Sequence, residues 1–150
     1  MALEEKQFCL SIFLDVSQAF DRIWIKGLSH KISQNISAQH VQILTSYLRD
    51  RTFYVHYEEA KSRDKSITAG LPQGGVLGPL LYLMCTADIP TLSDTTLARF
   101  ADDFTVISPH ANYNVATSRL QVAVTETVNW TTRWKIKMNT GKTVQVDFAH

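Results

Sequence analysis

Length, composition and charge limit what this chain can be before any motif is considered. Its 150 residues suit one domain with a single core. The chain is 45% hydrophobic and 19% charged, which is the composition of a globular protein. No apolar run approaches the roughly 18–20 residues of a membrane span, and the acidic start lacks the features of a signal peptide. We therefore expect an intracellular protein, of the nucleus or the cytoplasm, with no membrane partner. The net charge of +1 argues weakly against independent affinity for nucleic acid.

The first part of the chain predicts a strand, two helices and a hairpin. Residues 7–16 are a β-rich apolar run, and a helical pattern follows and extends to Ile32. Ser37 is a candidate N-cap for a second helix, whose apolar residues are spaced for one buried face: Val41, Leu44 and Leu48. The segments 52–57 and 65–69 predict the two strands of a hairpin, joined by the charged residues between them.

The middle of the chain predicts a loop, a helix and a tight hairpin. Residues 70–75 are a cluster of helix- and strand-breaking residues. Apolar residues then recur at helical spacing, with Pro79 in the first turn of the helix. The β-rich segments 97–101 and 104–107 bracket Asp102-Asp103, which predicts a hairpin with both acids at its tip.

The last part of the chain predicts a long helix and a closing strand. The helix runs to about Trp134, with Leu120, Val124 and Val128 on its buried face, and residues 144–148 alternate as a strand does. The order of all these elements implies several antiparallel pairings, so we expect an α+β fold with a small sheet covered by helices on one face. No linker or repeat marks an internal boundary, and residues 1–150 are expected to form one domain.

Three acidic residues stand at the ends of strand-like apolar runs. They are Asp15, after the first strand, and the adjacent pair Asp102 and Asp103. Acidic side chains in apolar surroundings need compensation for their charge, and a pair of divalent cations is one such compensation. A site of that kind performs phosphoryl-transfer chemistry. By themselves the acids leave open a solvated turn, because Asp-Asp at a hairpin tip is common turn chemistry.

Four segments, in the order found in the family, resemble the motifs of reverse transcriptases. Residues 13–21 (FLDVSQAFD) resemble motif A, and residues 70–80 (GLPQGGVLGPL) resemble motif B. Residues 100–103 (FADD) look like motif C in the form typical of non-LTR retrotransposons. The segment 134–139 (WKIKMN), followed by Lys142, is similar to motif D. Residues 47–51 (YLRDR) also resemble the corresponding segment of jockey-type elements of insects. The resemblance covers nearly the whole chain and implies the palm of a polymerase.

The resemblance implies a two-metal nucleotidyl transferase. Asp15 and Asp102 would bind two Mg²⁺ ions, with Mn²⁺ as an alternative, and Asp103 would shape the site and help to bind metal. The carbonyl of Val16 would be a further ligand. Oxygen ligands suit Mg²⁺ better than His or Cys would. Lys142 would act as general acid towards pyrophosphate, and a solvated surface lysine is the competing interpretation.

The resemblance also assigns residues to the nucleotide. Phe20 falls at the steric-gate position, where a bulky ring excludes a ribose 2′-hydroxyl; without the motif it would be read as a core aromatic. Gln73 would contact the incoming nucleotide or the template, and Gly74 and Gly75 would let the backbone approach the substrate closely. A solvated role and a functional role for Asp21 are equally consistent with the sequence.

The expected function is RNA-directed DNA synthesis, in which a dNTP is added to a DNA primer on an RNA template during retrotransposition. We expect this chain to be a palm fragment without the fingers and thumb segments of the parent polyprotein, and to be inactive by itself. The alternative is a non-catalytic remnant or interaction module that keeps the palm fold. Gly75 and Phe104 depart from the family, where Ser and Thr are usual. A palm-type cyclase lacks support, because the motif B segment fits reverse transcriptases better.

Overall fold

The computed structural model describes residues 7–148, which form two compact units. The sheet unit combines the chain up to Ala19 with the residues from Asp88 onwards. The helical unit is the segment Phe20–Ala87, inserted between these two parts in the sequence. Among residues 7–148, no helix has both the length and the apolar character that crossing a membrane requires.

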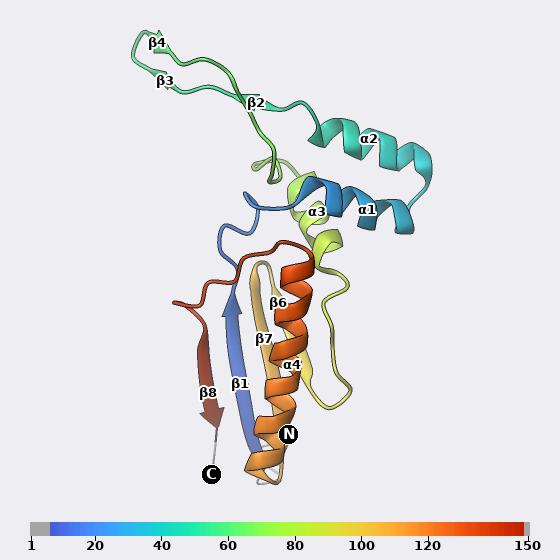
Figure 1. Cartoon of the computed structure of the whole chain (residues 1–150), viewed down its shortest axis with the longest axis vertical. Helices are drawn as coiled ribbons and strands as arrows, with labels where there is room; N and C mark the ends of the chain where they lie inside the picture. The colour runs from blue at the N-terminus through green and yellow to red at the C-terminus, as the bar shows by residue number, and fades with distance from the viewer. Residues whose placement is uncertain (1–6, 149–150) are drawn as a thin grey trace. The chain divides into compact units, whose positions relative to one another are not determined.

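The sheet unit is a four-stranded antiparallel sheet with one long helix on it (Figure 1). The strand order is β6-β7-β1-β8. The strands span Phe8–Asp15 (β1), Thr96–Phe100 (β6), Asp103–His110 (β7) and Val144–Phe148 (β8). The structure thus confirms the predicted α+β class, the first strand, the hairpin and the closing strand. β1 lies in the interior of the sheet, where it pairs with β7 on one side and with β8 on the other.

Helix α4 (Tyr113–Arg133) packs on β7 and β1 and covers one face of the sheet (Figure 1). The side chains that it buries are Ala116, Leu120, Ala123, Thr127, Trp130 and Thr131. The prediction of the buried face was therefore correct for Leu120 and wrong for the two valines, since Val124 is only half-buried and Val128 is 48% exposed. Steps of four residues drift off one face of a helix with 3.6 residues per turn. The true face includes small alanines and polar threonines, which a pattern of large apolar residues does not detect.

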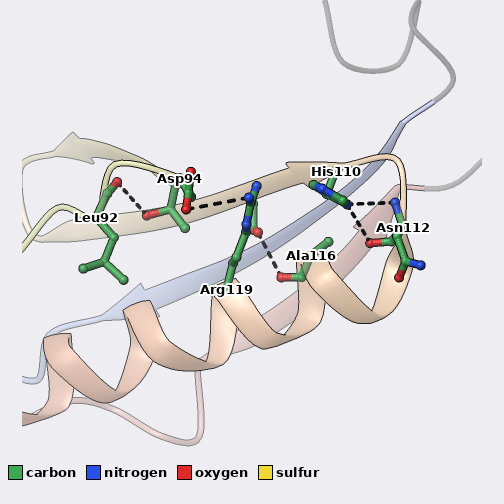
Figure 2. Close-up of polar contacts among 8 residues, drawn as sticks. Leu92, Asp94, His110, Asn112, Ala116 and Arg119 are labelled. Carbon is green, nitrogen blue, oxygen red and sulfur yellow. Dashed lines mark hydrogen bonds and ion pairs between the residues drawn. The ribbon is translucent and has the colours of Figure 1, made fainter.

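Polar contacts fix the N-terminal part of α4. The side chain of Asn112 caps the helix, since its Oδ1 accepts hydrogen bonds from the backbone N–H groups of Asn114 at 2.9 Å and Val115 at 3.3 Å. Such a cap satisfies donors that the first turn leaves without partners. Arg119 forms an ion pair with Asp94 at 3.7 Å, which ties the helix to the segment before β6 (Figure 2).

The helical unit contains α1 (Ile25–Asn35), α2 (Ala38–Leu48) and α3 (Leu77–Thr86), with α1 packed against both of the others. Its core is formed by buried side chains from these helices and from the turn before α1: Ile23, Leu28, Ile32, Leu48, Leu81, Tyr82 and Cys85. The start of α3 agrees with the prediction that Pro79 lies in its first turn.

The prediction for α2 was only partly right. Ser37 is the N-cap residue, but its hydroxyl makes no capping bond to the helix backbone and lies 2.7 Å from His40 Nδ1 instead. Leu48 is fully buried, whereas Val41 and Leu44 are half-buried. The helix thus packs mainly through its C-terminal end.

The predicted hairpin exists, but its turn is shorter than expected. β2 (Thr52–Phe53) pairs with β5 (Lys65–Ser66), and β3 (His56–Tyr57) pairs with β4 (Ala60–Lys61). The chain reverses at two residues, the first of which, Glu58, has a φ of +52°. The charged stretch between the two predicted strands, which suggested a long loop, therefore contains the short strand β4. Their side chains are exposed and place no constraint on pairing.

Candidate active site

The register of the sheet brings two of the three predicted acids together. β1 and β7 are antiparallel, and Asp15 lies directly opposite Asp103 at the end of the ladder. Side chains opposite each other in an antiparallel pair point to the same side of the sheet. Their neighbours Leu14 and Phe104, which also lie opposite each other, are 6% and 1% exposed. Successive residues alternate between faces, so the acids lie on the face that α4 does not cover.

The third acid lies in the turn that joins β6 to β7. Phe100 pairs with Asp103, so the turn consists of Ala101, which has a φ of +53°, and Asp102. The prediction that both acids occupy the tip is corrected here, because Asp103 is already the first residue of β7. All three carboxylates nevertheless stand at the same end of the sheet.

The predicted motif D segment is held against the end of β1. Ser17 donates a backbone hydrogen bond to the Lys137 carbonyl at 2.8 Å, and Asn139 donates one to the Asp15 carbonyl at 2.8 Å. These bonds flank a bridge between Val16 and Met138. The Val16 carbonyl is not an acceptor in either bond, and in this respect it fits the role of a ligand.

A turn that starts at Asn139 brings Lys142 to Asp15. The Asn139 carbonyl accepts backbone bonds from Lys142 and Thr143, both at 3.1 Å. The Lys142 Nζ lies 3.9 Å from Asp15 Oδ1, and the two side chains are 71% and 23% exposed. The lysine and the acid are 127 residues apart in the sequence, which shows that the pairing is tertiary. An exposed pair of this kind contributes little to stability.

The donors at this end of the sheet suit a hard divalent cation in kind. Carboxylate and carbonyl oxygens are the ligands that Mg²⁺ prefers. Within residues 7–148, however, no three Asp, Glu, His or Cys side chains are grouped closely enough to form a complete ligand set. Mg²⁺ keeps several waters and also takes substrate phosphates as ligands, so a few protein oxygens are sufficient.

The residues assigned to the nucleotide lie together in the helical unit. Phe20, Gln73, Gly74 and Gly75 line an opening of about 290 Å³, together with Pro72, Gly78 and Pro79. Two backbone bonds hold the loop before α3 to the turn that starts at Phe20. Leu71 donates to the Phe20 carbonyl at 2.7 Å, and Gly70 donates to the Ile23 carbonyl at 2.9 Å.

Two side chains support this opening. Gln73 Nε2 donates a hydrogen bond to Asp21 Oδ1 at 2.7 Å. Because an ionised carboxylate only accepts, the group facing it must be the amide NH₂, and the Gln73 carbonyl oxygen is left to accept from elsewhere. The half-buried ring of Phe20 stacks on Tyr82. The sequence did not decide the role of Asp21, and it did not single out Tyr82.

The structure thus assembles the predicted residues in two groups. The sheet unit holds Asp15, Val16, Asp102, Asp103 and Lys142, and the helical unit holds Phe20, Gln73, Gly74 and Gly75. A sheet that carries such acids at one end is the arrangement of a palm-type polymerase. Solved structures share the fold, including telomerase from Candida tropicalis with a TM-score of 0.68 and 20% identity over 94% of this chain and 31% of that one. For telomerase from Candida albicans the TM-score is 0.59 and the sequence identity 14%, over 92% of this chain and 27% of that one.

The family follows from the sequence comparisons. The family model of the reverse transcriptase (RNA-dependent DNA polymerase) matches residues 1–147, and the chain belongs to this family. It is 37% identical, over 99% of its length, to the RNA-directed DNA polymerase from mobile element jockey of Drosophila melanogaster. It is 38% identical to the probable RNA-directed DNA polymerase from transposon X-element of the same species, again over 99%. The chain spans 17% of the length of each relative. Reverse transcriptases generally use divalent metal ions.

Proposed function

We propose that this chain supplies the palm of an RNA-directed DNA polymerase of the non-LTR type. The reaction is the addition of a deoxynucleotide from a dNTP to the 3′-hydroxyl of a DNA primer on an RNA template. The observation that carries the proposal is the pairing of Asp15 with Asp103 at the end of β1 and β7, with Asp102 in the adjoining turn. Family membership and the resemblance to jockey polymerases support the same reaction.

The proposed cofactor is Mg²⁺, as two ions, with Mn²⁺ as an alternative. Asp15 and Asp102 would hold them, and Asp103 and the Val16 carbonyl would contribute. Two ions held by these residues would lower the pKa of the primer hydroxyl and neutralise the charge of the triphosphate. The half-buried Asp15 is fixed by the sheet on one side and by the bond from Asn139 on the other, so its carboxylate needs little reorganisation.

Lys142 is proposed as the general acid that protonates the leaving pyrophosphate. Its ammonium lies beside Asp15, at the end of the sheet where the triphosphate would be bound, and it carries protons that a leaving oxygen can accept. The side chain is 71% exposed and can turn from Asp15 to a phosphate without breaking a buried contact.

The helical unit is proposed to select the nucleotide. Phe20 acts as the gate against the ribose 2′-hydroxyl, and Gln73 presents its amide to the nucleotide or the template. Gly74 and Gly75 leave open space around the backbone there: a Cβ on Gly74 would meet nothing within 4 Å, and one on Gly75 would meet only Tyr47 Oη, at 3.7 Å. A backbone without side chains allows a substrate to approach closely.

The partners that we propose are an RNA template, a DNA primer, a dNTP and the fingers and thumb segments of a parent polymerase, with residues 1–150 forming part of its palm domain. We propose that it works inside the cell, in the nucleus or the cytoplasm. Relatives about six times longer than this chain support the view that the reaction needs such further segments.

The test is primer extension on an RNA template by the parent polymerase that carries this chain. Asp102→Asn should lose nearly all synthesis, because an amide is a weak ligand for a hard cation. Asp147→Asn is the matched control, because it makes the same chemical change far from the acids. Asp147 lies on β8 opposite Leu10, towards the other end of β1, and the variant should retain synthesis. Substantial synthesis by Asp102→Asn would contradict the metal assignment. A parent that makes no DNA even without substitutions would favour the non-catalytic remnant.

A further inference from the structure

We propose that Tyr82 is a positioning residue for sugar discrimination, because its buried ring holds the ring of Phe20 in place. The two rings stack, with centroids 4.9 Å apart and an interplanar angle of 28°. Tyr82 is 2% exposed, whereas Phe20 is half-buried and lines the opening of the helical unit. The inference rests on the proposed gate role of Phe20 and extends it to a residue that does not line the opening.

A steric gate must be rigid as well as bulky. The difference between the accepted and the rejected sugar is one oxygen atom, so a ring that can retreat slightly makes room for it. The backbone of Phe20 is fixed, since its carbonyl accepts the bond from Leu71 at 2.7 Å. The remaining freedom is the rotation of the side chain about its own bonds. Tyr82 covers one side of the ring and restricts that rotation.

Tyr82 is itself held firmly. It lies on α3 one turn after Gly78, and both residues belong to the buried face of this helix. A Cβ on Gly78 would lie 2.8 Å from the Pro72 carbonyl oxygen, which shows how closely α3 approaches the loop before it. The support for the gate is therefore part of the same packed structure as the loop that carries Gln73. Interiors packed in this way transmit small displacements to their neighbours.

The experiment compares kcat/KM for a dNTP and for the matching ribonucleotide in the parent polymerase. Tyr82→Leu removes the stacked ring and keeps an apolar side chain, and Tyr82→Phe keeps the ring. We expect Tyr82→Leu to reduce the preference for the deoxynucleotide about tenfold, which is the discrimination typical of a small change in pocket size. The loss should come from faster use of the ribonucleotide. Tyr82→Phe should keep the discrimination of the unsubstituted enzyme.

Two controls separate positioning from a general loss of structure. Leu48→Val shortens a side chain that is 1% exposed on α2, in the core of the same unit. It should lower stability and leave sugar selectivity unchanged. If Tyr82→Leu does not fold, Tyr82→Met replaces it, since methionine fills irregular space and lacks a ring to stack.

The outcomes distinguish this inference from the function on which it rests. Unchanged selectivity in folded Tyr82→Leu or Tyr82→Met, beside relaxed selectivity in Phe20→Val, would overturn the role of Tyr82 and leave the gate intact. Unchanged selectivity in Phe20→Val would overturn the gate and this inference together. The polymerase assignment is judged separately, by the loss of synthesis in Asp102→Asn.

Discussion

Gly70 lies where the loop before α3 meets the backbone of the turn after β1, and replacing it with alanine tests how tightly the two are packed. Its φ is +84°, and an added Cβ would lie 2.6 Å from the Asp21 carbonyl oxygen. Gly74, four residues later, has nearly the same φ of +87° but meets nothing within 4 Å. The two glycines therefore have nearly the same φ and differ in the space around them.

This difference predicts two magnitudes. A side chain in the left-handed region costs about 1–2 kcal/mol, which is the whole expected loss for Gly74→Ala. Gly70→Ala carries the same cost, and forcing an extra carbon against fixed backbone adds about 1–3 kcal/mol. Together the two costs give an expected loss of about 2–5 kcal/mol for Gly70→Ala.

The measurement is urea unfolding of the chain and of both variants, followed by the same signal. The urea concentration at the midpoint should be highest for the unsubstituted chain, lower for Gly74→Ala and lowest for Gly70→Ala. The slope of the free energy of unfolding against urea concentration should be similar in all three. Equal losses in the two variants would refute the close approach of the loop to Asp21. A negligible loss in Gly74→Ala would instead refute the strain assigned to a positive φ at that residue.

Three further predictions concern the sheet unit. Leu120→Ala should lower the free energy of unfolding by about 2–5 kcal/mol, whereas Val128→Ala should change it by less than about 1 kcal/mol, and similar losses in urea unfolding would contradict the buried face of α4. The hydrogen bond to Asp147 and the charge of that residue raise the pKa of Tyr113 above its ordinary value of 10.0. The contact therefore stabilises the folded state below pH 10, where the phenol is protonated, and this stabilisation is lost as the pH rises through the pKa of the folded state. Asp147→Asn should lower this pKa, and an unchanged phenolate titration would exclude the contact. Lys142→Met should slow single-turnover nucleotide addition by the parent about 10²-fold without lowering stability, and an unchanged rate would leave the lysine as a surface residue.

The sequence predicts the sheet better than the helix that covers it. An apolar run that ends in Asp15 and an acidic pair between two β-rich segments are strong local signals, and the structure confirms the strands that they imply. The pairing of Asp15 with Asp103 could not be predicted, because register is a property of two distant segments. The face of α4 was misjudged because Thr127 is buried and Val128 is not, and hydropathy ranks the two in the opposite order.

The candidate site shows the same division between local and tertiary information. Motif spacing was sufficient to single out Gln73 and Phe20, but the groups that orient them come from elsewhere in the fold. The bond from Gln73 to Asp21 joins residues 52 positions apart, and the stack of Phe20 on Tyr82 joins the turn after β1 to α3. Neither contact leaves a pattern in one segment of sequence, so only the structure reveals what supports the predicted residues.

The two departures from the family pattern fall at positions where the fold can absorb them. Phe104 follows the acidic pair but is 1% exposed, and it lies on the α4 side of β7, opposite Leu14. Because neighbouring strand residues point to opposite faces, the large ring enlarges the core and does not crowd Asp103. Gly75 has an ordinary φ, and a Cβ there would meet only Tyr47 Oη, at 3.7 Å. The glycine is therefore not required by the backbone, and the serine usual in the family would fit in its place. Neither departure disturbs the acids or the loop, so neither counts against the proposed reaction.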